Sequence, residues 1–117
     1  MQSFPKNTRL CSRHEFARVK AQGQTQRGRY LLLSALITDV PQPARLGVIT
    51  TRRLGPAHDR VQMRRLVREH FRKQRNDMPK GLWLVVVVRR PCPPKEREQL
   101  SEEWLRLAHA LAILPIP

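Results

Sequence analysis

The sequence predicts a single α+β domain, residues 1–117, in which helices pack on one small mixed sheet. The chain has 117 residues, 40% of them hydrophobic, which is enough for one domain with one core. Short apolar stretches of strand length alternate with longer stretches of helical periodicity. Their order is α-β-β-α-β-α. The general rule predicts a right-handed crossover for the strand–helix–strand unit if its strands are parallel.

The N-terminal part contains the first predicted helix. Residues 1–11 form a basic lead-in segment that we expect to be mobile. Ser12 and Glu15 have the spacing of a capping box, which predicts a helix start, and Gly23 is a natural stop. Phe16 lies on the apolar side of this helix, where a packing role and a role as a ligand platform both fit the pattern.

Two strands are predicted next. Residues 24–29 are polar and form either a linker or a short edge strand. Residues 30–37 are continuously apolar, which predicts a strand buried on most of both faces. After a connection with two prolines, residues 45–51 are rich in β-branched side chains and predict a second strand. Gly47 within it indicates a bulge or the close approach of another backbone.

A basic loop and helix at residues 52–75 form the most polarised stretch of the chain. Asp59 and Gln62 have capping-box spacing, so we expect the helix to begin at Asp59. One face is apolar and carries Met63, Leu66, Val67, His70 and Phe71, whereas the other carries Arg64, Arg65, Arg68, Arg72 and Arg75. Like charges at i,i+4 repel each other, so this face favours a polyanion-binding surface over a solvated one.

The C-terminal part predicts one strand and one helix. Residues 82–88 (LWLVVVV) are the strongest strand signal and predict a central strand. The last helix lies within residues 95–114 and packs through an apolar stripe, which consists of Leu100, Trp104, Leu107, Ala108 and Leu111. Glu102 and Glu103 favour its start if Ser101 is the N-cap. We interpret Trp104 as a packing anchor rather than a base-stacking platform.

The charge of the chain is strongly positive and unevenly distributed. The net charge is +14, with a pI of about 11.6. Residues 1–94 hold 20 of the 23 basic residues and five of the nine acids, so they carry +15, whereas residues 95–117 carry −1. Such a field attracts nucleic acid or an anionic membrane surface. We therefore expect the polyanion-binding surface on the first part and a packing role for the last.

The sequence has no motif for catalysis or metal binding. Cys11 and Cys92 are far apart, and the four histidines form no spaced ligand set with them, so we expect reduced thiols and no metal site. A nucleophile elbow and a phosphate-binding Gly-rich loop are also missing, so we expect no catalytic residues in the polypeptide. No apolar run is long enough to span a bilayer and no signal-peptide core is present, so we expect a cytoplasmic protein.

The central stretch resembles the protein subunit of bacterial ribonuclease P. The resemblance rests on residues 45–72, RLGVITTRRLGPAHDRVQMRRLVREHFR. That family has a strand of the form Arg-Val-Gly-Leu-Ser-Val-Ser, two basic residues, Gly-x-Ala, and a basic helix that begins Arg-Asn-Arg and ends Ile-Arg-Glu-x-Phe-Arg. Here the strand begins Arg45-Leu-Gly-Val, Arg52 and Arg53 form the basic pair, and the helix ends Val67-Arg-Glu-His-Phe-Arg72. The order of the elements matches over nearly the whole chain.

This resemblance implies a fold, a function and contact residues. The fold has a left-handed strand–helix–strand crossover, against the general rule. The protein binds a catalytic RNA, which removes the 5′ leader of precursor tRNA with Mg²⁺, so the polypeptide is the non-catalytic subunit of an endoribonuclease and binds no cofactor alone. The implied RNA-binding residues are Arg52, Arg53, Arg60, Gln62, Arg64, Arg65, Arg68 and Arg72. Leader contact, in a cleft beside the first helix and the sheet, is implied for Phe16, Lys20 and Tyr30.

The chain departs from the family at two places. Arg-Asn-Arg reads Arg60-Val61-Gln62 here, so Val61 cannot donate a hydrogen bond to RNA, and Gln62 lacks the charged fork of arginine. Of the aromatic residues that the family offers to bound RNA, Phe16 remains, Lys20 replaces one, and Tyr30 is a nearby substitute. We therefore expect less base stacking and a larger share of phosphate contacts.

Two other functions are compatible with the residues. A general RNA-binding or ribosome-associated protein of similar fold, without tRNA-processing activity, would also account for the altered motif. Association with a membrane surface is disfavoured, because the apolar side of the basic helix carries only the residues that a core needs. We expect neither DNA nor a membrane as a partner.

Overall fold

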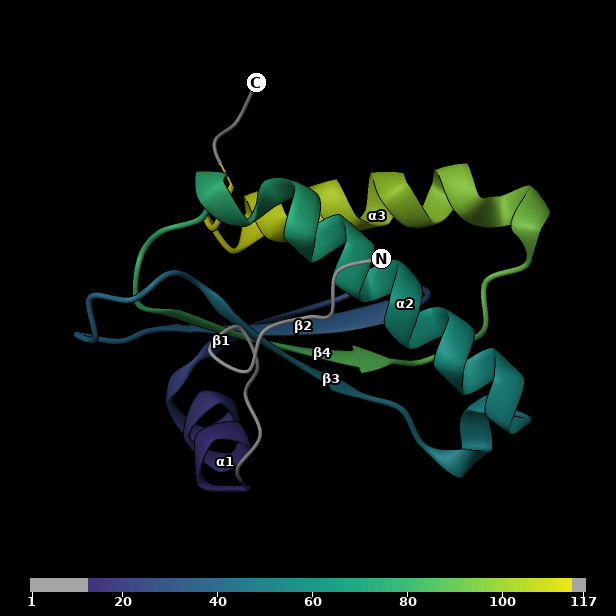
Figure 1. Ribbon diagram of the computed structural model, residues 1–117, viewed down its shortest axis with the longest axis horizontal. Helices are drawn as coiled ribbons and strands as arrows, with labels where there is room; N and C mark the ends of the chain where they lie inside the picture. Colours follow the sequence, from purple (N-terminus) through teal and green to yellow (C-terminus); the bar gives the residue numbers. More distant parts are fainter. Residues whose placement is uncertain (1–12, 115–117) are drawn as a thin grey trace.

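The computed structural model describes residues 13–114, which form three layers (Figure 1). The middle layer is a four-stranded sheet with the strand order β1-β2-β4-β3. Helices α2 and α3 cover one face of this sheet, and α1 covers the other (Figure 1). The predicted α+β class with one mixed sheet is confirmed. The predicted lead-in at residues 1–11 lies outside the described residues.

The elements follow the predicted order with one addition. The helices are α1 (Arg13–Gln22), α2 (Ala57–Gln74) and α3 (Arg97–Ala110). The strands are β1 (Gln24–Arg27), β2 (Leu31–Ile37), β3 (Arg45–Ile49) and β4 (Leu82–Val88). The addition is β1, which turns the polar segment after α1 into an edge strand that pairs antiparallel with β2. All four residues of β1 are exposed.

Strand β4 is central, as predicted. It pairs antiparallel with β2 and parallel with β3. Alternation along β4 places Leu84 and Val86 in the main core under α2 and α3, and Val85 toward α1. Gly47 pairs in unbroken register with Val85, so the predicted bulge is absent from β3. The parallel pairing across α2 gives the strand–helix–strand unit, and its left-handed course stays a prediction.

Helix α2 begins three residues earlier than predicted. Pro56, rather than Asp59, is the residue before the helix, and its carbonyl accepts the amides of Asp59 at 3.1 Å and Arg60 at 3.2 Å. Gly55 makes the preceding turn with a φ of +140°, which side chains with a Cβ rarely adopt. The predicted cap at Asp59 is therefore wrong. Asp59 lies in the first turn, where its charge stabilises the helix N-terminus.

Helix α3 also begins earlier than a Ser101 cap would allow. It starts at Arg97, and the Ser101 hydroxyl donates back to the Arg97 carbonyl at 3.2 Å. Trp104 is fully buried and its indole N–H donates to Gln74 of α2, so its predicted role as a packing anchor is confirmed. Within residues 13–114, no helix has the length and apolar character needed to cross a membrane.

Candidate nucleic-acid interface

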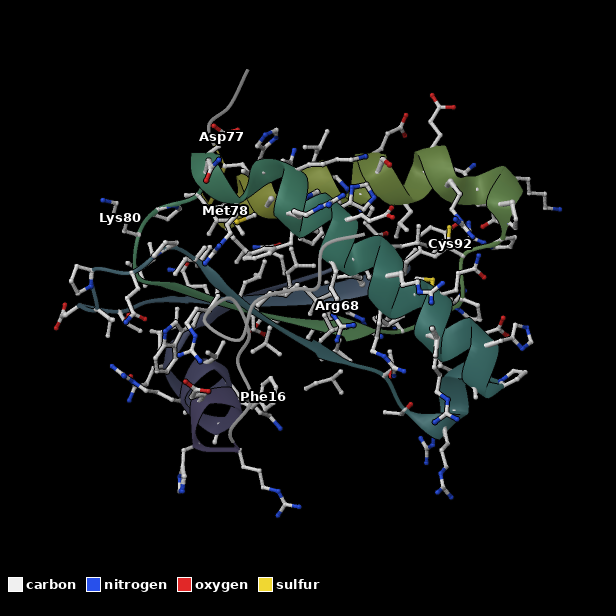
Figure 2. The ribbon with its side chains drawn as sticks, viewed as in Figure 1. Phe16, Arg68, Asp77, Met78, Lys80 and Cys92 are labelled. Atoms are coloured by element: carbon white, nitrogen blue, oxygen red, sulfur yellow. The ribbon has the colours of Figure 1, made fainter. Side chains whose placement is uncertain are left out.

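The first part of the candidate interface is a basic surface on α2 and the turn before it. It consists of the eight predicted RNA-binding residues, Arg52, Arg53, Arg60, Gln62, Arg64, Arg65, Arg68 and Arg72. Three of these, Arg60, Arg64 and Arg68, are half-buried, and the other five are exposed. The apolar side of α2 is buried in the core, so the remaining sides must carry the charges. Figure 2 shows Arg68 beside the middle of α2.

Some arginines of this region also hold the fold together. The Nη1 of Arg64 donates to the hydroxyl of Thr50 at 2.6 Å, which ties α2 to the end of β3. The Nε of Arg60 is buried and has no hydrogen-bond partner among the described residues. Arg75 was predicted on the basic face, but this is wrong. Its Nε donates to the Ala44 carbonyl at 2.8 Å, and burial lowers the pKa of its guanidinium.

The altered motif lies at the surface. Val61 is 38% exposed, an unusual position for a large apolar side chain, and it follows Arg60 in the first half of α2. Gln62 is also exposed. The departure from the family pattern therefore affects the surface and leaves the buried side of α2, which contains Met63, unchanged.

The second part is a groove of about 430 Å³ between α1 and the sheet. Its walls come from α1 and from all four strands, and the lining residues are Phe16, Ala17, Lys20, Thr25, Leu32, Ser34, Ile49, Val85 and Val87. Phe16 is half-buried, because it both packs against Val19 and Val85 and borders the groove. Figure 2 shows Phe16 beside α1. The packing role of Phe16 is thus confirmed, and its role as a ligand platform stays a prediction.

The groove has an apolar lining with a few polar groups. The hydroxyls of Thr25 and Ser34 lie 2.9 Å apart and hydrogen-bond to each other. Lys20 is exposed and adds a positive charge at the border. Flat rings stack on apolar and aromatic walls, and a lysine attracts the phosphate attached to such a ring, so this lining suits a single-stranded nucleotide.

The sequence did not identify the strand residues of the groove. The prediction for residues 30–37 is a strand buried on most of both faces, which does not single out Leu32 and Ser34 as residues that border a groove. The available signal was Ser34, a polar residue in an otherwise apolar strand, because such a residue indicates a face that borders a site rather than a core.

Tyr30 does not line the groove, so its predicted leader contact is wrong. It is 3% exposed and belongs to the core on the side of α3. Its hydroxyl donates to the carboxylate of Glu96, and this hydrogen bond raises the pKa of Tyr30 to about 12. Tyr30 precedes β2, where the strand alternation that turns Leu32 and Ser34 toward α1 has not begun.

Glu103 holds the backbone around Tyr30. It is 5% exposed, and its carboxylate accepts the amides of Arg29 at 2.6 Å and of Tyr30 and Leu31 at 2.8 Å. It therefore joins α3 to the start of β2 and does not favour the start of α3 as predicted. Its position inside the apolar stripe was the available signal, because a buried carboxylate needs partners.

The basic surface and the groove meet at the end of β3. Ile49 lines the groove, and the next residue, Thr50, accepts the hydrogen bond from Arg64. Among residues 13–114, no three His, Cys, Asp or Glu side chains are grouped so as to hold a metal ion. Cys92 is buried in the linker before α3, and burial raises the pKa of its thiol.

The fold and this surface define a class of small, basic α+β proteins with an arginine-rich helix beside a sheet groove. The ribonuclease P family model matches residues 4–112. The ribonuclease P protein component of Chlamydia trachomatis is 32% identical over 112 residues, covering 95% of this chain and 92% of its own length. That of Thermotoga petrophila is 31% identical over 103 residues, covering 88% and 80%.

Solved structures agree with this assignment. The RNase P protein from Thermotoga maritima superposes with a TM-score of 0.68 at 28% identity, covering 85% of this chain and 93% of the other. The Staphylococcus aureus RNase P protein, at 19% identity, shares the fold with a TM-score of 0.80, covering 92% and 98%. The chain belongs to the ribonuclease P protein family. It is accordingly the protein component of a tRNA-processing ribonucleoprotein with RNA as its partner.

Proposed function

We propose that the chain binds the catalytic RNA of ribonuclease P through the basic surface and the 5′ leader of precursor tRNA through the groove. The observation that carries this proposal is the junction at the end of β3, where Thr50 contacts Arg64 and Ile49 borders the groove. One protein can then hold both RNAs at adjacent sites.

The two sites suit different parts of RNA. Exposed arginines such as Arg65 and Arg72 donate to phosphates and need no access to base faces. The groove is shaped by Phe16 and aliphatic strand residues, so it favours unpaired bases, and a leader is single-stranded. Phe16 and Lys20 are still proposed to contact the leader, and Ser34 and Thr25, which also line the groove, are added to the proposed contact residues.

In this proposal the polypeptide supplies no reacting group. The lining of the groove contains no carboxylate and no imidazole among the described residues. The RNA holds the Mg²⁺ ions that drive cleavage, while the protein neutralises part of the repulsion between the two RNAs. We therefore expect the protein to lower the Mg²⁺ concentration that the reaction requires.

Reconstitution tests this function. The full chain is combined with the cognate catalytic RNA, and cleavage of a precursor tRNA is followed over a Mg²⁺ series. The protein should shift the half-maximal Mg²⁺ concentration downward for a precursor with a long leader, and less for one with a leader of one or two nucleotides. RNA-free protein should not cleave.

Three results would contradict the proposal. An equal shift of the half-maximal Mg²⁺ concentration for both leader lengths would mean that the leader does not bind in the groove. Cleavage by RNA-free protein that a point substitution abolishes would place the chemistry in the polypeptide. Binding of many unrelated RNAs without any shift would favour the general RNA-binding function.

A further inference from the structure

Helix α1 divides the sheet face that it covers into two sides. Val19 points at the sheet and is fully buried. At about 100° per residue, Phe16 and Lys20 lie to one side of Val19 and border the groove. Glu15 and Arg18 lie to the other side. The proposed leader contact uses only the groove side, so the second side has no role in it.

Trp83, at the start of β4, lies on this second side. The guanidinium carbon of Arg18 is 5.3 Å from the centroid of the Trp83 ring system, and that of Arg45 is 5.8 Å from it. Arg45 is ion-paired with Glu15, Nη1 to Oε2, at 2.7 Å. Arg18 is exposed and donates to the neutral amide of Gln22 at 3.3 Å. The cluster therefore keeps one positive charge at the surface.

Trp83 packs against the cluster of Val19 and Val85, but it is less buried than the second tryptophan of the chain, Trp104. Trp104 is fully buried and its indole N–H is hydrogen-bonded within the core. Trp83 is only half-buried, and two guanidinium groups converge on its ring. Because Glu15 neutralises Arg45, the charge that remains beside the ring is that of Arg18, and it attracts an anion from solvent.

We propose that Trp83 and Arg18 form a second contact for single-stranded RNA, on the side of α1 away from the groove. A base stacks against the exposed part of the Trp83–Arg18 pair, and its phosphate accepts a hydrogen bond from Arg18. Aromatic rings and arginine planes are the surfaces on which unpaired bases stack. The partner is single-stranded because the bases of a duplex do not present their faces.

Tryptophan fluorescence of the full chain tests this contact. An oligoadenylate of about ten nucleotides, within the range that one single-strand site covers, is titrated into a Phe16→Ala background, which removes the stack in the groove. Binding should quench the emission of Trp83, because Trp104 is buried. Arg18→Gln should weaken binding about fivefold or more, the scale of one base stack with its phosphate. Arg106→Gln, on α3 with a side chain 67% exposed, is the charge-matched control and should weaken it less than twofold.

The contact would be overturned if Arg18→Gln and Arg106→Gln weakened binding equally, or if quenching persisted in Trp83→Phe. The Arg18 variant keeps the test decisive if substitution of Trp83 disturbs folding. A failure here would leave the leader groove untouched, because that site is tested through Phe16 and the length of the leader. A failure of the groove would likewise leave the Trp83 contact standing.

Discussion

Phe16 is placed where both of the roles that its sequence position allows, packing and contact with a ligand, are open to it. Its ring packs partly against Val19 and Val85 and partly borders the groove. Phe16→Ala should therefore lower the free energy of unfolding by about 2 kcal/mol, less than the roughly 3–5 kcal/mol of a fully buried phenylalanine. It should also weaken binding of a single-stranded leader by about 1–3 kcal/mol, the scale of one base–aromatic stack.

Val19→Ala is the matched control for this prediction. Val19 lies on the same helix and is fully buried, so its truncation should reduce stability without removing a stacking surface. Denaturant unfolding gives the stability of both variants, and titration with a leader oligonucleotide gives their affinity for the leader. Equal loss of leader binding in the two variants would mean that Phe16 acts only through the packing of α1.

Tyr30 is the residue whose predicted role changes most. Because its hydroxyl donates to the partly buried carboxylate of Glu96, Tyr30→Phe should lower the melting temperature at neutral pH while leaving leader binding within about twofold. The raised pKa of Tyr30, about 12 against a usual 10, favours the protonated form in the folded state. That contribution to stability is complete below pH 10 and is lost as the pH rises toward 12.

Unfolding at alkaline pH tests whether the Tyr30 hydroxyl is bonded to Glu96 or is free to contact a leader. Wild-type protein should lose more stability between pH 10 and pH 12 than Tyr30→Phe does. Equal losses of stability in the two proteins would contradict the hydrogen bond to Glu96. A leader affinity that falls more than tenfold in the variant would mean that Tyr30 contacts the leader.

The elements of this chain differ in how far their sequences determine them. The apolar run of β4 and the stripe of α3 specify strand and helix through periodicity alone. Edge strand β1 does not, because its four exposed residues carry no apolar pattern and form a strand only by pairing with β2. The predicted start of α2 was wrong because the turn at Gly55 and Pro56 already starts the helix at Ala57, so Asp59 lies inside the first turn and is not the cap.

The candidate site likewise has a part that a local sequence pattern predicts and a part that depends on tertiary structure. The arginines of α2 could be proposed as candidates from the sequence, because charge patterning is local to one helix. The groove was only partly identified, since its lining comes from five elements and depends on which side of each strand faces α1. Ser34 and Ile49 are brought together by the pairing of β2 and β3 with β4, which no local pattern reveals.

Helix α2 allows a test of the basic surface by charge. Val61→Asn with Gln62→Arg restores the family pattern at two exposed positions, so stability should change by only about 0.5 kcal/mol. The added arginine should steepen the salt dependence of binding to the catalytic RNA by about one unit. Arg65→Ala with Arg72→Ala, at exposed positions, should flatten it by about two units.

The dissociation constant over a salt series measures these slopes. Arg64 is left intact, because its bond to Thr50 would mix a structural effect with the loss of a charge. Arg106→Ala on α3 controls for the loss of one positive charge away from α2. Identical slopes in the restored, the depleted and the wild-type proteins would mean that the RNA is held away from α2.

At the scale of the whole molecule, the sheet separates the two proposed sites. Helix α2 lies on one face and α1 with the groove on the other (Figure 1). The hydrogen bond from Arg64 to Thr50 links them at the end of β3. The sites should therefore act independently wherever a variant leaves this link intact.

A double-mutant cycle tests this independence. Phe16→Ala and the pair Arg65→Ala with Arg72→Ala are measured alone and together for binding of precursor tRNA to the complex with the catalytic RNA. Sites that share no partner usually add, so the combined loss should equal the sum of the separate losses within about 0.5 kcal/mol. Thr50→Val removes the hydrogen-bond acceptor of Arg64 and keeps every charge. In this background, the loss of affinity caused by Phe16→Ala and the loss caused by the arginine pair should both differ from their values in the wild-type protein. A departure from additivity above about 1 kcal/mol in the first cycle would mean that one continuous RNA path crosses the groove and α2 together.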